Sequence, residues 1–352
     1  MTPISLFDPL TVGELRLPNR IVMAPLTRAR AGAGRVPTPM MARHYAARAD
    51  TGMILSEATA VSPQGVGYAD TPGLWHDAQV DGWRQVTGAV HAAGGRILAQ
   101  LWHVGRISDP VFLDGAPPVA PSAIAPAGSV SLLRPRRPYV TPRALRPDEI
   151  PGIVEDYRRA AVNARRAGFD GVEIHAANGY LIDQFLQDRS NHRTDGWGGT
   201  VPNRARLLLD ITDAVTGVWG AGRVGVHLAP RGDAHDMGDR DPAALFGHVA
   251  RELDRRGIAF LCVREHLGPG RLLPMIREAF RGALIANEGL TPASAADLLA
   301  RGEADAVAFG RASIAHADLV ARLRRGEPLA SPDPQFFYAG GAQGYLDGPD
   351  AA

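Results

Sequence analysis

The chain has 352 residues, of which 45% are hydrophobic, so it can bury one large core, and we predict a single domain over residues 1–352. Its 38 basic residues are all arginine and are scattered among 37 acidic ones without runs of like charge, which argues against nucleic acid or a membrane surface as a partner. The single cysteine, Cys262, excludes an internal disulfide and a multi-cysteine metal site. No apolar stretch has the length of a signal peptide or a membrane span. We therefore expect a cytoplasmic protein without a metal site.

Short apolar or β-branched segments alternate with amphipathic helical ones along the chain, which is typical of parallel strands joined by helical crossovers. Ahead of the first strand, residues 6–18 look like a hairpin. The eight predicted strands are residues 21–26, 53–57, 97–101, 171–175, 224–228, 259–263, 283–286 and 306–310. The clearest predicted helices are residues 77–93, 148–167, 203–218, 241–256 and 291–300.

The ends of the predicted helices carry residues suited to capping. Thr291 stands before Pro292, so a side-chain cap adjoins a residue whose fixed φ suits the first helical turn. Gly168, Gly257 and Gly302 stand where three helices should end, because glycine tolerates positive φ.

Eight evenly spaced strand and helix units favour a closed (β/α)₈ TIM barrel. A doubly wound sheet and two smaller domains are disfavoured, because no GxGxxG follows the first strand and no linker-like segment divides the chain. Residues 117–147 are dense in proline and arginine and lack helical periodicity, so we expect an excursion over the barrel mouth. The N-terminal hairpin is expected to plug the bottom of the barrel.

Polar side chains gather at the carboxyl ends of the predicted strands, where the loops of such a barrel converge on one mouth. In chain order they are Thr27, Glu57 with Ala58, Gln100 with Trp102, His175, His227, Asn287 and Arg311. A barrel with a purely structural role does not require this pattern, so we predict an active site at the mouth.

Several motifs in the same order along the chain resemble the Old Yellow Enzyme family, in the branch that includes N-ethylmaleimide reductase. They are residues 24–28 (APLTR), 100–106 (QLWHVGR), 190–195 (SNHRTD), 198–199 (GG), 203–204 (NR), 309–311 (FGR) and 337–341 (FYAGG). The resemblance covers nearly the whole chain. It implies an FMN-dependent TIM barrel that takes hydride from NADPH or NADH and reduces electron-poor C=C bonds in enones, enals, maleimides or nitroalkenes.

The resemblance also implies which residues bind non-covalent FMN. Gln100 is expected to pair with the pyrimidine ring, Thr27 to bond near the flavin O4, and the backbones of Pro25 and Ala58 to line the ring. The phosphate is expected over the last two strand ends. There the chain offers Asn287, Gly289, Gly310 and Arg311.

Two positions depart from the family pattern. Glu288 stands where relatives have small residues, and since a carboxylate facing the phosphate would repel it, we expect Glu288 to point away. His227 stands where the family carries an arginine beside flavin N1 and O2. An imidazole supplies positive charge only when it is protonated, so the flavin would have a weaker cationic partner unless Arg231 reaches it.

The substrate residues follow the fourth strand. By resemblance, His175 and Asn178 hold the carbonyl or nitro oxygen of the substrate, and Tyr180 donates a proton to the carbon next to the activating group. Tyr68, Trp102 and Tyr338 are expected to form aromatic walls. Arg134, Arg136 and Arg137 crowd the excursion, where they either meet the phosphates of the nicotinamide cofactor or lie in solvent.

Two alternatives remain open from the sequence. One is an FMN-dependent desaturase or redox-neutral isomerase of a dedicated pathway, and the other is a barrel that has lost FMN and catalysis because of His227 and Glu288. The expected partners are an activated alkene and a nicotinamide cofactor, and the chain is expected to be a monomer or a homodimer.

Overall fold

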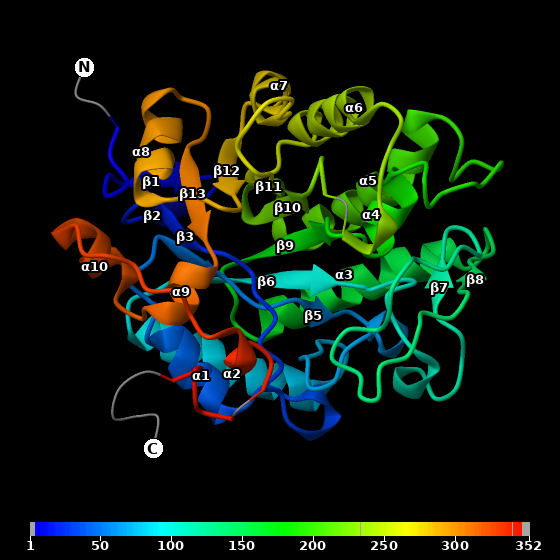
Figure 1. The fold of residues 1–352 in the computed structure, drawn as a ribbon, viewed down its shortest axis with the longest axis horizontal. Coiled ribbons are helices and arrows are strands. Elements are labelled where there is room, and N and C mark those ends of the chain that lie inside the picture. The colour runs from blue at the N-terminus through cyan, green and yellow to red at the C-terminus, as the bar shows by residue number, and fades with distance from the viewer. Residues whose placement is uncertain (1–3, 233, 340, 347–352) are drawn as a thin grey trace.

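The computed structural model describes residues 4–232, 234–339 and 341–346. Within them, eight parallel strands surround one axis (Figure 1). They are β3 (Ile21–Met23), β4 (Met53–Leu55), β6 (Ile97–Trp102), β9 (Gly171–Ala176), β10 (Val224–Leu228), β11 (Phe260–Arg264), β12 (Ala283–Asn287) and β13 (Ala306–Phe309). The neighbours run β4-β3-β13-β12-β11-β10-β9-β6, and pairing between β4 and β6 closes the ring. The predicted TIM barrel is confirmed. Of the 337–341 motif, Gly340 lies outside the described residues.

Helices cover the outside of the barrel and join successive strands (Figure 1). The predicted helices correspond to α2 (Asp77–Ala92), α3 (Ile150–Arg166), α5 (Val201–Trp219), α6 (Pro242–Arg255) and α8 (Pro292–Ala300). The others are shorter: α1 (Pro39–Ala46), α4 (Leu181–Leu186), α7 (Leu273–Ala279), α9 (Arg311–Ala315) and α10 (Leu319–Arg325). Short helices show too few turns for a periodic pattern to stand out in the sequence. In the described chain, no helix combines the length and apolarity that crossing a membrane requires.

The predicted helix ends are confirmed. Thr291 accepts a hydrogen bond from the backbone N–H of Ser294, and the Ser294 side chain accepts one in return, ahead of α8. The three predicted stop glycines have φ values of 84°, 64° and 66°. The first strand, β3, ends at Met23 instead of continuing to residue 26, and Pro25 has no N–H to extend the ladder.

The N-terminal hairpin closes the bottom of the barrel as predicted. Strands β1 (Leu10–Val12) and β2 (Leu15–Leu17) pair antiparallel. Their buried side chains pack in one cluster with residues of the barrel interior such as Phe260. The turn requires glycine, because Gly13 has a φ of 56° and a Cβ there would lie 2.2 Å from the carbonyl oxygen of Gly222.

The excursion between β6 and α3 lies over the mouth. Its residues 129–132 line the same cavity as Thr27 and Tyr180. Two short strands that the sequence pattern did not indicate, β7 (Val119–Ala120) and β8 (Arg143–Ala144), pair at its base. No α-helix interrupts the described residues 117–147.

Candidate active site

A buried polar layer lies inside the barrel beneath the mouth. Gln100 of β6 donates from Nε2 to the Glu173 carboxylate of β9 at 2.7 Å, and the same nitrogen lies 3.3 Å from His227 Nδ1. His227 of β10 lies 3.5 Å from Glu173 Oε2. Glu173 is fully buried, and its Oε1 has no partner among the described residues. This layer brings together two predicted flavin residues, Gln100 and His227, around a carboxylate that we did not predict.

His175 also belongs to this interior. Its ring stacks on that of His227 with centroids 5.4 Å apart, and the Tyr180 ring meets it edge-on at 5.1 Å. Burial, and then the charges of His227 and Arg264, hold the pKa of His175 well below its ordinary value. A neutral imidazole at pH 7 can donate one N–H to a substrate oxygen.

Tyr180 follows His175 on the loop after β9. Its hydroxyl lies 3.1 Å from that of Tyr68. Burial raises the pKa of Tyr180 above that of an ordinary phenol, so the hydroxyl keeps its proton at neutral pH. The structure therefore holds a protonated phenol at the mouth, as a proton donor requires.

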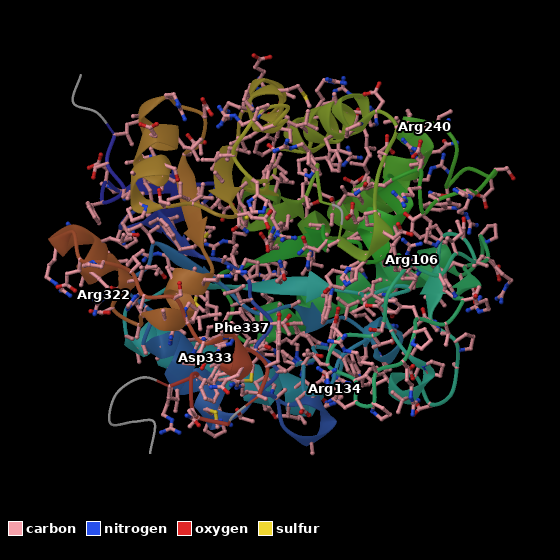
Figure 2. The ribbon with its side chains drawn as sticks, viewed as in Figure 1. Arg106, Arg134, Arg240, Arg322, Asp333 and Phe337 are labelled. Atoms are coloured by element: carbon pink, nitrogen blue, oxygen red, sulfur yellow. The ribbon has the colours of Figure 1, made fainter. Side chains whose placement is uncertain are left out.

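A cavity of about 510 Å³ opens beside Tyr180. Thr27, Tyr68, Tyr338 and His235 line it, together with Arg134 and Arg136 of the excursion. In Figure 2, Arg134 on the excursion and Phe337 on the C-terminal segment both lie below β6. Tyr68 and Tyr338 thus form walls of the cavity. Arg137 lies 3.7 Å from Asp109 and does not line this cavity.

Trp102 lies behind this wall. It is fully buried, stacks on Tyr68 with centroids 5.5 Å apart and meets Tyr180 edge-on at 4.9 Å. It supports the two tyrosines and does not itself face the cavity.

The loop after β3 is held by another carboxylate. Glu57 accepts hydrogen bonds from the backbone N–H groups of Arg28 and Ala29 at 3.1 and 3.2 Å. The loop, with the partly buried Pro25 and Thr27, is thereby fixed next to the buried Ala58. Pro25 and Ala58, predicted to line the flavin ring, and Thr27, predicted to bond near O4, lie on these neighbouring strand ends.

The predicted phosphate residues come from the ends of β12 and β13. Asn287 and Gly289 flank Glu288, while Gly310 directly precedes α9 and Arg311 is its first residue. Glu288 forms an ion pair with Arg264 and lies 3.4 Å from His266 Nε2. The Glu288 carboxylate therefore contacts two groups that can carry positive charge, Arg264 and His266.

Arg231 does not join His227. Its Nε donates to Glu265 at 2.7 Å, and its remaining nitrogens donate to the carbonyls of Pro269 and His266 at 2.8 and 2.7 Å. These bonds hold Arg231, which lies in the loop after β10, against the loop that follows β11.

The residues present fit FMN, which needs donors along its pyrimidine edge and a cation at its phosphate. His175 Nδ1 and His227 Nε2 are buried and have no hydrogen-bond partner among the described residues. Buried ring nitrogens are rarely left without a partner; a flavin would supply one to His227, and a bound substrate would supply one to His175. The exposed Arg311 makes no ion pair with another described residue, so its charge is available to a phosphate.

One group of metal-ligating type also lies in the interior. Glu173, His227 and Cys262 present ligand atoms within 4.8 Å of one another. However, Gln100 already donates to the carboxylate and approaches the imidazole, so hydrogen bonds account for the layer.

Comparison with known proteins identifies the family. Residues 5–330 match the model of the NADH:flavin oxidoreductase / NADH oxidase family. The chain belongs to this family. A probable flavin mononucleotide-dependent alkene reductase of Leishmania infantum is 44% identical, over 98% of this chain and 97% of its own. The 12-oxophytodienoate reductase 2 of Arabidopsis thaliana is 39% identical, over 98% of this chain and 96% of its own.

Solved structures of the family have the same fold. The Old Yellow Enzyme homologue of Zymomonas mobilis superposes with a TM-score of 0.95 at 45% identity, covering 98% of this chain and 99% of that one. Morphinone reductase, in complex with tetrahydroNAD, gives a TM-score of 0.95 at 48% identity, covering 98% and 97%. The predicted Old Yellow Enzyme family, FMN cofactor and NAD(P)H-dependent oxidoreductase are confirmed.

Three residues of the site were not predicted: Glu173, Arg264 and His235. Glu173 stands two positions before His175, so strand periodicity placed both on one face and could have indicated it. Arg264 is the residue after the predicted sixth strand and could have been read as a strand-end cation. His235 lines the cavity from the loop after β10, and no sequence pattern marks it.

Proposed function

We propose that this protein reduces a C=C bond conjugated to a carbonyl or nitro group, with hydride from NADPH or NADH. FMN supplies the hydride carrier between the nicotinamide and the alkene. The names of the alkene reductase and 12-oxophytodienoate reductase relatives support this reaction class. The observation that carries the proposal is the protonated Tyr180 beside Tyr68 in the wall of the cavity.

The roles of the three substrate residues follow from their chemistry. As hydride reaches the β-carbon, negative charge develops on the conjugated oxygen, and N–H donors from His175 and Asn178 stabilise it. Tyr180 then gives its proton to the α-carbon, so the alkene gains two hydrogens in all. The phenolate takes its proton back from solvent.

Neither alternative from the sequence analysis gains support. The hypothesis that FMN has been lost depended on the charges of Glu288 and His227. However, Glu288 is paired with Arg264, and the buried His227 Nε2 has no partner among the described residues, so it can bind a flavin. No described residue of the mouth favours a desaturase or an isomerase over a reductase.

The remaining expectations belong to the same proposal. We infer that the partners are the activated alkene and the nicotinamide cofactor, and that the protein is a cytoplasmic, single-domain monomer or homodimer. The balanced charge and the single cysteine support this.

Tyr180→Phe tests the mechanism, because only alkene reduction needs the phenolic proton. We expect 2-cyclohexenone consumption to fall by roughly 100-fold or more, while NADPH bleaches the flavin at nearly the wild-type rate when no enone is present. The matched control is Tyr157→Phe, a buried tyrosine of α3 outside the cavity, which should leave both rates near wild type. Equal losses of both rates in Tyr180→Phe would assign Tyr180 another role.

A further inference from the structure

Arg264 is a partly buried cation at the mouth that the proposed function does not use. It is the last residue of β11, and its guanidinium contacts the loops that follow two other strands. Nη1 donates to Asn178 Oδ1 of the β9 loop at 2.6 Å, while Nη2 pairs with Glu288 of the β12 loop. The Arg264 side chain therefore links the loop after β9, which carries Asn178, to the loop after β12, which is expected near the FMN phosphate.

The contact with Arg264 determines which way the Asn178 amide faces. A guanidinium has donors and no acceptor, so the Asn178 atom that lies 2.6 Å from it must be the oxygen. The Nδ2 group, which has two donors, then points away from Arg264. No described residue accepts a hydrogen bond from it. Only this orientation leaves Asn178 able to donate to a substrate oxygen.

The backbone of Asn178 is fixed independently. Its φ is 62°, and its carbonyl lies 2.7 Å from His235 Nδ1. The following N–H, of Gly179, donates to Asp183 at 2.8 Å. With the backbone held on both sides, the remaining freedom is rotation of the side chain, and the bond to Arg264 removes it.

Arg264 is itself anchored. Glu288 pairs with it from a backbone conformation of positive φ, 91°, and His266 lies 3.4 Å from the same carboxylate oxygen. Positive φ is costly for a residue with a Cβ, so the site retains Glu288 in a conformation that glycine adopts freely. This gives the glutamate a role, that of holding the guanidinium in place.

We propose that Arg264, held by Glu288, is a positioning residue that fixes the Asn178 amide with Nδ2 toward the oxygen of the activated alkene. The inference rests on the proposed function, because it gives Asn178 the role of donor. The permanent charge of Arg264 acts on the substrate oxygen through Asn178, at a site where the His175 imidazole is neutral. Charge on the guanidinium polarises the amide in the direction that strengthens its donation.

Binding of cyclohexanone tests the proposal without turnover. This saturated ketone presents the same oxygen as 2-cyclohexenone but has no conjugated C=C bond to reduce. Its dissociation constant can be measured from the change it causes in the visible spectrum of the FMN-loaded protein. We expect Asn178→Ala and Arg264→Gln each to weaken binding by about tenfold, since the first removes the Nδ2 donor and the second releases the contact that orients it. The double variant Asn178→Ala/Arg264→Gln should bind no more weakly than Asn178→Ala alone.

Arg271→Gln is the matched control. Arg271 lies on the same loop after β11, loses the same charge on substitution and pairs with Glu303 instead of Asn178. It should bind cyclohexanone as the wild type does. Glu288→Gln keeps Arg264 but weakens its anchor, so it should show a smaller loss in the same direction, and it replaces Arg264→Gln if that variant fails to fold.

The outcomes separate this inference from the proposed function. Additive losses in the double variant, or wild-type binding by both Arg264→Gln and Glu288→Gln, would overturn the positioning role while leaving alkene reduction in place. Failure of the wild type to consume 2-cyclohexenone would reject the function itself. Wild-type binding by Asn178→Ala would reject Asn178 as the donor, and the role of Arg264 with it.

Discussion

His227 illustrates how one residue changes the charge at the site. Glu173 is a fully buried carboxylate, and the groups that face it include the amide of Gln100, the imidazole of His227 and the neutral thiol of Cys262. A buried carboxylate is costly without a positive partner. In relatives that carry arginine at position 227, the resemblance implies a permanent cation at this point. We infer that the imidazole here serves Glu173, which lies 3.5 Å away, and also the flavin edge.

His227→Arg should restore that cation. We expect the midpoint potential of the bound FMN at pH 8 to rise by roughly tens of millivolts, because a guanidinium there stabilises the additional negative charge of the reduced cofactor. Glu173 offsets part of the effect. A redox titration of both proteins at pH 8 measures it, and His227→Gln, which adds no charge, should not raise the potential. Identical potentials in wild type and His227→Arg would show that residue 227 does not face the flavin.

At the residue scale, the sequence identified groups that carry their chemistry in a local motif. His175, Asn178 and Tyr180 lie within six positions, and Gln100 and Trp102 share one strand. Arg264 and Glu288 could not be identified in this way. They are 24 positions apart, and their link to Asn178 spans 86 positions, so only the folded barrel brings them together.

At the element scale, the long helices were predictable because each repeats a pattern over many residues, and the barrel strands because short apolar or β-branched segments recur between those helices. The strand pair β7 and β8 was not, since each strand has two residues and no alternation can be recognised. The hairpin of β1 and β2 falls between these cases. Its alternation of buried Leu15 and Leu17 with exposed Arg16 is short but complete.

That alternation gives a matched test of the plug at the bottom of the barrel. Leu17→Ala should lower the free energy of unfolding by about 2 to 5 kcal/mol, because Leu17 is 2% exposed and its loss leaves a cavity. Arg16→Ala, on the opposite face of the same strand, should change it by less than about 0.5 kcal/mol. Urea unfolding of the FMN-loaded proteins measures both values. Similar losses would mean that the hairpin does not pack into the barrel.

For the whole molecule, closure of the barrel places carboxylates where water does not reach. Glu57, two residues after β4, is fully buried, and burial raises its pKa from 4.5 to about 7, although the N–H groups of Arg28 and Ala29 partly offset the rise. Between these values the folded protein keeps a proton that the unfolded chain has released. The contribution of Glu57 to stability is therefore largest in acid, falls as pH rises through this window and levels off above about pH 7.

Glu57→Gln removes this dependence, because a glutamine carries no proton to release. Relative to wild type, the free energy of unfolding of the variant should increase by roughly 2 to 3 kcal/mol between pH 5 and pH 8. Other titrating groups are common to both proteins and cancel in the difference. Urea unfolding with excess FMN at the two pH values gives the measurement, and Glu278→Gln, which alters an exposed carboxylate, should show no such change. If the difference between Glu57→Gln and wild type is the same at pH 5 and pH 8, Glu57 is ionised in the folded protein throughout this range, and the loop after β3 is held by a charged carboxylate.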